Sequence, residues 1–142
     1  MKMPAFLLAL ALCLMSYPSL IAQDNIVGIW KTVNEEGETE SHVEIFEKSG
    51  KFYGKVVKLI SAEEGSICDK CPDEKKDQPI LGLEILWGLK SYKDYWSYGK
   101  IMDPNNGKTY KCSIWLKSPD QLTVRGYIGI SALGRSQTWY RV

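Results

Sequence analysis

The sequence predicts an all-β domain, a single up-and-down antiparallel barrel of eight strands. Apolar and polar residues alternate with a period of two along most of the chain, and amphipathic helical periodicity is not the dominant signal. Short turns rich in glycine, proline and asparagine separate most of these segments. The first and last segments would be neighbours in a closed sheet, and closure removes exposed edges. A β-sandwich is the alternative arrangement.

The N-terminus has the pattern of a secretory signal peptide, residues 1–22. Lys2 supplies the positive charge, an almost purely apolar run extends from Ala5 to Met15, and we expect cleavage after Ala22. The apolar run is short for a bilayer span, which favours cleavage over a retained membrane anchor. Lipid attachment at Cys13 is the alternative. The predicted mature protein is one domain, residues 23–142, that is exported to the periplasm or the extracellular space and keeps no transmembrane segment.

The predicted mature chain is electrically balanced. Cleavage removes Lys2 from the 18 lysines and arginines, which leaves 17 basic residues against 17 acidic ones. These charges are scattered, and no long block of one sign occurs. A neutral chain gives no electrostatic reason to expect a nucleic acid or an anionic membrane surface as partner.

Eight segments carry the strand pattern. In order they are residues 26–33, 41–48, 51–60, 80–87, 97–102, 108–117, 121–128 and 135–142. Ser49-Gly50 predicts a tight hairpin, because glycine supplies the positive φ that short turns need. Asp103-Pro104-Asn105-Asn106-Gly107 predicts a second turn, in which proline presets φ, and Ser118-Pro119-Asp120 a third. An aromatic stretch, residues 89–98, leads into the fifth strand.

Alternation also assigns faces to individual side chains. Cys112 falls on the apolar face of its strand, which predicts a buried, unpaired thiol. Arg125 falls opposite the apolar face of its own strand and should point outward. One face of the last strand is shared by Arg135, Gln137, Trp139 and Arg141. If that face is the interior, the barrel has a partly polar lining.

One long loop, residues 61–79, contains the Cys-x-x-Cys pair Cys68 and Cys71. Such a pair is a loop-stapling disulfide, half of a zinc site or a redox dithiol. Zinc needs two further ligands, and Cys112 and the sole histidine, His42, lie on separate strands without paired spacing. A redox cysteine usually begins a helix, and no helical pattern follows here. Because thiols of exported proteins tend to oxidise, we predict a disulfide and no metal site.

Eight motifs together carry a specific resemblance. They are Gly28-Ile29-Trp30-Lys31-Thr32, Gly50-Lys51-Phe52-Tyr53-Gly54-Lys55, Cys68-Asp69-Lys70-Cys71, Gln78-Pro79-Ile80-Leu81-Gly82, Gly99-Lys100-Ile101-Met102-Asp103-Pro104, Gly107-Lys108-Thr109-Tyr110, Arg125-Gly126-Tyr127-Ile128-Gly129 and Gly134-Arg135-Ser136-Gln137-Thr138-Trp139. In these motifs, which cover almost the whole mature chain, the sequence resembles DUF2147, a family of small exported bacterial proteins. The resemblance implies an extracytoplasmic setting in the bacterial envelope, and it brings no established activity or functional residues.

A looser resemblance links the chain to lipocalins and related calycin barrels. It rests on Gly28-x-Trp30 in the first strand and Arg141 in the last. A guanidinium stacked on an indole gains cation–π attraction, and its alkyl stem covers the ring. We therefore expect Gly28, Trp30 and Arg141 to close and plug one end of a lipocalin-like barrel. Any ligand should then enter at the opposite mouth.

The sequence shows no convincing catalytic set. With a single histidine on the polar face of its strand, a histidine-based triad has one poor candidate, and we predict a non-enzymatic protein without a cofactor. We predict that a small hydrophobic or amphipathic molecule binds in the barrel. The candidate ligand-binding residues are Trp96, Tyr98, Arg135, Gln137 and Trp139, with ordinary core packing of the aromatic residues as the alternative.

Two other functions stay open. The first is an envelope protein-interaction module that uses an exposed aromatic patch, the run from Tyr92 to Tyr98. The second is a thiol-redox protein that works through Cys68 and Cys71.

Overall fold

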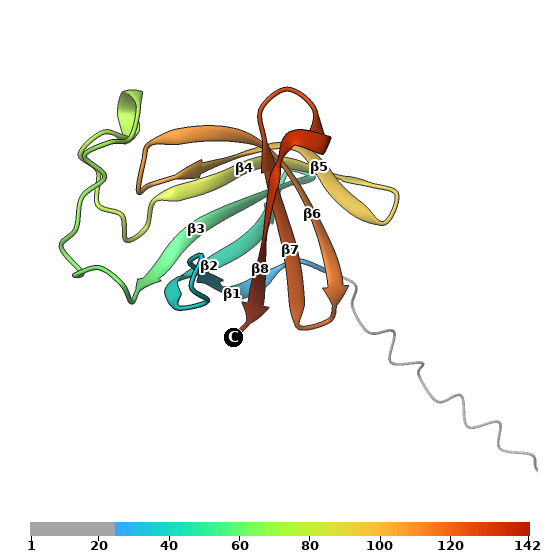
Figure 1. Ribbon diagram of the computed structural model, residues 1–142, viewed down its shortest axis with the longest axis horizontal. Helices are drawn as coiled ribbons and strands as arrows, with labels where there is room; N and C mark the ends of the chain where they lie inside the picture. Colours follow the sequence, from blue (N-terminus) through green and yellow to red (C-terminus); the bar gives the residue numbers. More distant parts are fainter. Residues whose placement is uncertain (1–24) are drawn as a thin grey trace, which may run out of the picture.

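The computed structural model describes residues 25–142, and the predicted signal peptide lies outside them. Eight antiparallel strands pair in chain order and close into a barrel, which confirms the predicted fold class (Figure 1). The strands are β1 Gly28–Val33, β2 Thr39–Lys48, β3 Lys51–Leu59, β4 Glu84–Tyr92, β5 Tyr95–Asp103, β6 Lys108–Ser118, β7 Gln121–Tyr127 and β8 Arg135–Arg141. Two short 3-10 helices, η1 Asp73–Lys75 and η2 Ser131–Leu133, lie in the connections.

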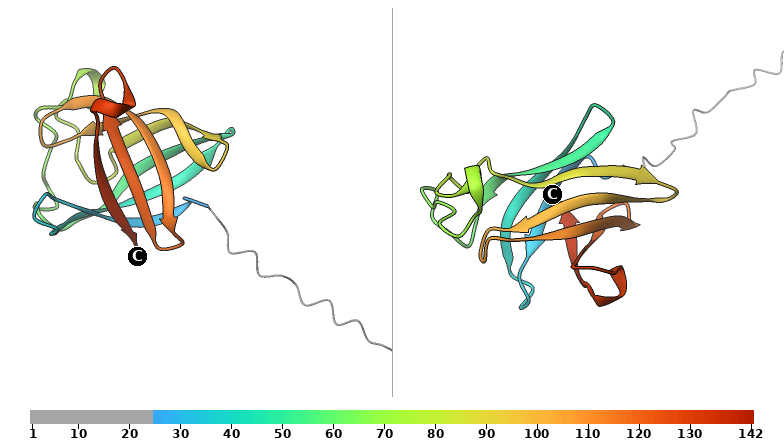
Figure 2. Two further views of the ribbon diagram at one scale, coloured as in Figure 1. Left: turned by 45° about the vertical axis from the view of Figure 1, so that its right-hand side comes forward. Right: turned by 90° about the horizontal axis from the view of Figure 1, so that it is seen from above.

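The two ends of the barrel differ in their connections (Figure 2). At one end the turns at residues 49–50, 93–94 and 119–120 are tight, and Gly28 and Arg141 lie beside them. We call this the closed end. At the other end the connections are longer, at residues 34–38, 60–83, 104–107 and 128–134. We call this the open end.

The seam between β1 and β8 is short. The two strands pair only through Trp30 with Arg141 and Lys31 with Tyr140, next to the closed end. Beyond Lys31, β1 continues along β2 as far as Val33, and β8 has no ladder partner on that side within residues 25–142. The wall is therefore continuous near the closed end and interrupted toward the open end.

Inward-facing apolar side chains fill much of the barrel. The largest fully buried side chains of the strands' inner face include Trp30, Val43, Ile45, Leu86, Leu89, Ile114, Leu122 and Trp139, whereas Cys68 is buried in the long connection, outside the barrel. The packing is tight enough to require glycine at Gly99, where an added Cβ would lie 2.7 Å from Leu89 Cγ. As predicted, Cys112 is buried on this inner face.

The predicted fourth strand was wrong in its bounds. Residues 80–83 form a turn, in which the amide of Leu83 donates to the carbonyl of Ile80, and β4 begins only at Glu84. The strand then continues through Gly88, whose φ of 73° accompanies an irregularity in the β3–β4 register. The aromatic stretch is therefore not a lead-in to β5. It forms the β4–β5 hairpin itself, which turns at Lys93 and Asp94.

The long connection between β3 and β4 packs on the outside of the barrel. Cys68 and Cys71 form a disulfide, as predicted, and both are buried. The amide of Cys68 donates to the carbonyl of Gln78 at 2.8 Å, which folds the loop back on itself. The Cys68–Cys71 tip of this loop lies against the β5–β6 turn. The two segments are so close that a Cβ on Gly107 would overlap the Lys70 carbonyl.

Candidate functional site

The closed end is sealed by Arg141. Its guanidinium carbon lies 4.2 Å from the centroid of the Trp30 ring. The guanidinium donates to the carbonyl oxygens of Pro119, Val27 and Asn25 at 2.9 to 3.0 Å. A Cβ on Gly28 would lie 2.7 Å from Arg141 Nη1, so only glycine leaves room for the arginine. This end of the barrel offers no access to the interior.

The five candidate ligand-binding residues do not form one group. Trp96 faces inward near the closed end, with its ring edge-on to Phe52 at 6.1 Å. Tyr98 lies on the outer surface and is 68% exposed, with a φ of 64° in an irregular part of β5. The structure therefore separates these two residues from each other and from the three candidates on β8.

The three candidates on β8 share its inner face, which confirms the alternation read from the sequence. Trp139 is buried opposite Leu122, and its indole N–H donates to Gln137 Oε1 at 3.4 Å. Gln137 is exposed although it follows the same face. Arg135 lies at the rim, where its guanidinium is exposed and lies 3.7 Å from Glu35. The inner face of β8 thus changes from apolar to polar toward the open end.

The barrel wall near this mouth contains a glycine at which a small side chain would fit without a clash. Gly126 pairs with Cys112 on one side and Arg135 on the other, which places it on the inner face. A Cβ added there would lie 3.4 Å from Tyr110 Cβ and 3.7 Å from Ile101 Cγ2, at ordinary contact distances. Ile101 and Tyr110 are half-buried and pair with each other. At Gly126 the wall therefore presents no side chain to these two residues, which are themselves partly exposed.

A carboxyl pair lies close to the open end. Burial raises the pKa of Glu40, the nearby Asp103 carboxylate raises it further, and a hydrogen bond from the Asn105 side chain opposes the shift. Glu40 is the second residue of β2, whereas Asp103 ends β5. The two carboxylates are thus near enough to interact although their strands are not neighbours in the sheet.

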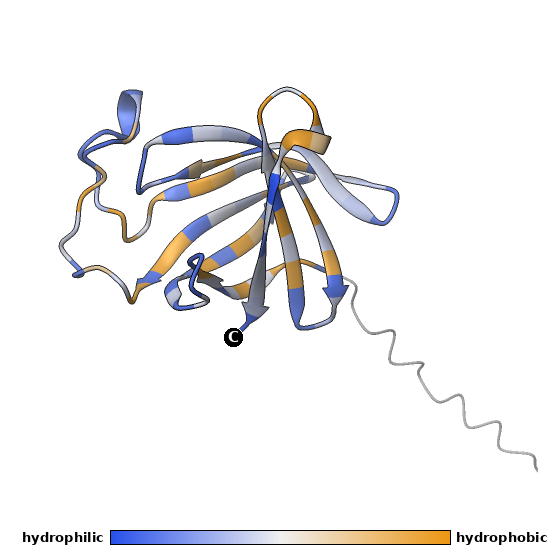
Figure 3. Cartoon of the chain, in the orientation of Figure 1, coloured by the Kyte–Doolittle hydropathy of each residue, from blue (hydrophilic) through white to orange (hydrophobic). Residues whose placement is uncertain are grey.

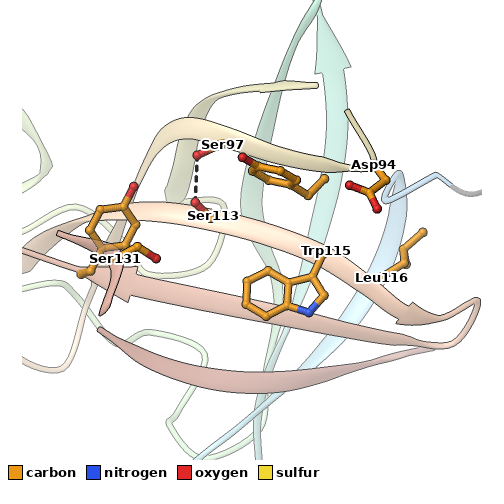
Figure 4. Close-up of a pocket in the computed structure, with 8 residues that line it drawn as sticks. Asp94, Ser97, Ser113, Trp115, Leu116 and Ser131 are labelled. Carbon is orange, nitrogen blue, oxygen red and sulfur yellow. Dashed lines mark hydrogen bonds between the residues drawn. The ribbon is translucent and has the colours of Figure 1, made fainter. Parts of the chain in front are cut away.

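A second concave site lies on the outside of the wall, and sequence reasoning missed it (Figure 4). This outer groove encloses about 480 Å³. It is lined by Asp94, Tyr95, Ser97, Ser113, Trp115, Leu116, Tyr127 and Ser131. Most of these residues come from β5, β6 and β7, on the face opposite Cys112 and Ile114. No pattern in the sequence marked the groove, because it depends on how the β4–β5 hairpin and the β7–β8 connection fold.

Two hydrogen bonds shape the outer groove. Ser97 Oγ and Ser113 Oγ lie 2.8 Å apart and are both buried. Arg125 Nε donates to the carbonyl oxygen of Ser131 at 2.9 Å, and Nη1 donates to Ser136 Oγ. Arg125 therefore points outward, as predicted, and ties η2 back onto β7. The hydrogen bonds of Arg125 thus hold η2 in place as one wall of the outer groove.

The electrostatics of the outer groove favour positive charge. Asp94 is the one charged residue in its lining. The pKa of Tyr95 is raised by burial and then by nearby acidic groups, which include Tyr92, Tyr98 and Asp94. A ligand that brings another negative charge into the outer groove is therefore disfavoured.

The remaining reactive groups are poorly placed for chemistry. Burial raises the pKa of the Cys112 thiol to about 12, which keeps it protonated and unreactive. Burial of both Cys68 and Cys71 limits attack on their disulfide. In residues 25–142, histidine, cysteine, aspartate and glutamate side chains form no group of three that could hold a metal ion. Across the same residues, no helix is long and apolar enough to span a membrane.

Comparisons with known proteins agree with this architecture. Protein HP1028 from Helicobacter pylori, described as belonging to the lipocalin family, matches with a TM-score of 0.73 and 24% identity over 83% of each chain. A redesigned beta barrel matches with a TM-score of 0.44 and 18% identity, over 82% of this chain and 90% of its own. No curated protein sequence matches significantly.

The likeness to HP1028 shows the fold, a lipocalin-like barrel. The family model described as an uncharacterized protein conserved in bacteria, DUF2147, matches residues 28–141, the whole barrel from β1 to β8. The chain therefore belongs to the DUF2147 family.

Proposed function

We propose that this protein is a binding module, rather than an enzyme, that holds a small amphipathic molecule at the open end of its barrel. The observation that carries the proposal is the position of Gln137, which follows the inner face of β8 and yet is exposed. One step further inside, Trp139 is buried on the same face. A ligand at this mouth meets an apolar surface below and polar groups at the rim.

The walls beside Gln137 suit such a ligand. Ile101 and Tyr110 contribute half-buried apolar surface, and the Tyr110 hydroxyl adds a polar tip. Gly126 adds no side chain beside them, where a Cβ would be in ordinary contact with both. Because Trp30 and Arg141 seal the other end, a ligand enters from the open end and the apolar core limits its depth. An amphipathic molecule with a short apolar tail fits this combination better than a long, fully apolar one.

The test uses the mature domain, residues 23–142, and dansyl-labelled undecanoic acid as a fluorescent probe. We expect saturable binding that Gly126→Leu weakens at least tenfold, because the leucine side chain would occupy the lumen between Tyr110 and Ile101. Thr138→Val is the matched control, since Thr138 neighbours Gln137 but faces outward. Binding that is equally strong in both variants, or no saturable binding to the folded domain, would contradict the proposal.

A second candidate function is an envelope protein-interaction module. The surface that favours it is the β7–β8 connection, and not the aromatic run predicted from the sequence. In the aromatic run only Tyr92 and Tyr98 are exposed large residues, whereas Trp96 is buried. The β7–β8 connection instead carries Ile128, Ile130 and Leu133 at 63 to 76% exposure, and Figure 3 shows apolar stretches along this connection. A photo-crosslinking side chain at residue 130 should trap one defined partner in the native bacterium. A control at Tyr140 should not, and equal or diffuse products at both sites would exclude this function.

A further inference from the structure

The outer groove contains three aromatic side chains, Tyr95, Trp115 and Tyr127. The hydroxyls of its buried Ser97–Ser113 pair already bond to each other, so they do not by themselves require a polar ligand. The aromatic rings are different, because the face of each ring carries partial negative charge that attracts a cation.

Four other aromatic rings of this chain already have a cation supplied by the chain itself. The pairs are Arg141 with Trp30 at 4.2 Å, Lys75 with Trp87 at 4.8 Å, Lys93 with Tyr92 at 5.4 Å and Lys55 with Phe46 at 5.5 Å. Within residues 25–142, no lysine or arginine stacks on Tyr95, Trp115 or Tyr127. The outer groove is thus a set of cation-attracting rings without a cation.

The charges around the outer groove agree with the lack of a built-in cation on its rings. Its lining contains the carboxylate of Asp94 and no lysine or arginine. Two cations beside the lining are engaged elsewhere: Arg125 donates to the Ser131 carbonyl and to Ser136 Oγ, and Lys111, which pairs with Tyr127, donates through Nζ to the Gly129 carbonyl. A carboxylate beside several aromatic rings attracts a bulky cation through both its charge and the rings.

We propose that the outer groove binds an organic cation that carries a methylated ammonium group. A methylated ammonium is weakly hydrated, so it gives up little on leaving water and fills an aromatic site well. This site is distinct from the barrel mouth. The groove lies on the outward face of β5 and β6, whereas the residues proposed to bind at the mouth face inward.

Choline and its neutral isostere, in which a quaternary carbon replaces the nitrogen, separate charge recognition from hydrophobic binding. In calorimetric titrations of the mature domain we expect choline to bind at least tenfold more tightly than the isostere. Asp94→Asn should weaken choline binding about threefold to tenfold by removing the carboxylate, and should leave the isostere unchanged. Trp115→Leu should abolish the choline signal.

The controls locate the site. Trp87→Leu should leave choline binding unchanged, because the Trp87 ring is already covered by Lys75. Gly126→Leu should also leave it unchanged, so this proposal can fail or succeed independently of ligand binding at the mouth. In two-dimensional NMR, the indole N–H signal of Trp115 should be the tryptophan signal that shifts most with choline. Equal affinity for the isostere, full binding by a folded Trp115→Leu variant, or a largest shift at another tryptophan would overturn the proposal.

Discussion

Trp30 and Trp115 are the same kind of side chain in two very different surroundings. Trp30 is fully buried at the closed end, its indole N–H donates to the Ile26 carbonyl at 2.8 Å, and Arg141 covers its ring. Trp115 is half-buried on the outer face and has no cation from the described chain. The difference teaches that a ring covered by a built-in cation serves architecture, whereas a ring such as that of Trp115, which is partly exposed and has no built-in cation, is available to a ligand.

The cause of the difference lies in the strand order. Closure of the barrel brings β1 beside β8, so the last strand delivers its own arginine to the ring on the first strand. Trp115 pairs instead with Thr123 on β7, and the groove around it is lined by serine hydroxyls, two tyrosine rings, Leu116 and the Asp94 carboxylate. No strand crosses this face to supply a cation.

The largest expected effect on stability comes from replacing each of these two tryptophans with alanine, which tests the comparison directly. Trp30→Ala should destabilise the domain by about 3–5 kcal/mol, because it removes a fully buried ring and leaves a cavity. Trp115→Ala should cost only about 1 kcal/mol, because the ring is partly in water already. Urea unfolding followed by circular dichroism measures both. Similar losses at the two positions would show that Trp115 is structural and would remove the contrast.

A smaller effect is expected from the cation itself. Arg141→Met keeps much of the apolar stem but leaves the carbonyl oxygens of Pro119, Val27 and Asn25 without their donor, and should cost about 2 kcal/mol. Arg135→Met on the same strand is the matched control. Its exposed ion pair with Glu35 should contribute about 0.5 kcal/mol or less. Equal losses in the two variants, measured by urea unfolding, would mean that Arg141 does not hold the seam.

Much of the fold was predictable because its signals are local. Alternation gave the eight strands, and tight turns such as Ser49-Gly50 gave their order along the sheet. Trp30 and Arg141 pair because closure follows from eight sequential strands. The bounds of β4 were not predictable, because the apolar residues 80–83 look like a strand. Their hydrogen bonds differ from those of a regular strand: the Ile80 amide donates to the Ser66 carbonyl in the long connection, and only Gly82 and Leu83 bond to β3, both to Val56, on either side of the turn.

The candidate site was less predictable than the fold. Alternation placed Gln137 and Trp139 correctly on one face, but it gave no sign that Tyr98 sits at a bulge and turns outward. The outer groove depends on the bond from Arg125 to the Ser131 carbonyl, which connects β7 to η2. Such a contact follows from the path of a glycine-flanked connection, and residue types alone do not determine that path.

A second built-in cation allows a weaker test of the same comparison. Lys75 lies over the Trp87 ring, and its Nζ donates to the Glu84 carbonyl at 3.0 Å, which holds η1 against β4. Lys75→Met should cost about 1 kcal/mol and speed proteolysis within residues 61–79. Lys76→Met is the control, since Lys76 is exposed next to it. Unchanged cleavage rates in Lys75→Met would show that this cation does not anchor the connection.

The smallest expected effect concerns the open end. Burial and the Asp103 carboxylate raise the pKa of Glu40, so the folded state holds the proton more tightly than the unfolded state does. The stability gained from this proton is complete below the ordinary pKa of 4.5 and is lost as the pH rises through the folded value. At pH 7 the ionised carboxylate therefore opposes folding.

Glu40→Gln removes that penalty and should stabilise the domain at pH 7 by roughly 0.5 kcal/mol, a value kept small because solvent screens this half-exposed group. The advantage should shrink as the pH falls and should vanish below the ordinary pKa of 4.5, where Glu40 is protonated in both states. Urea unfolding at several pH values measures the trend, with Glu47→Gln on the exposed part of β2 as control. If the stabilisation by Glu40→Gln instead grew toward acid pH, the folded state would favour the Glu40 carboxylate. The open end would then, like the closed end, contain its own counter-charge.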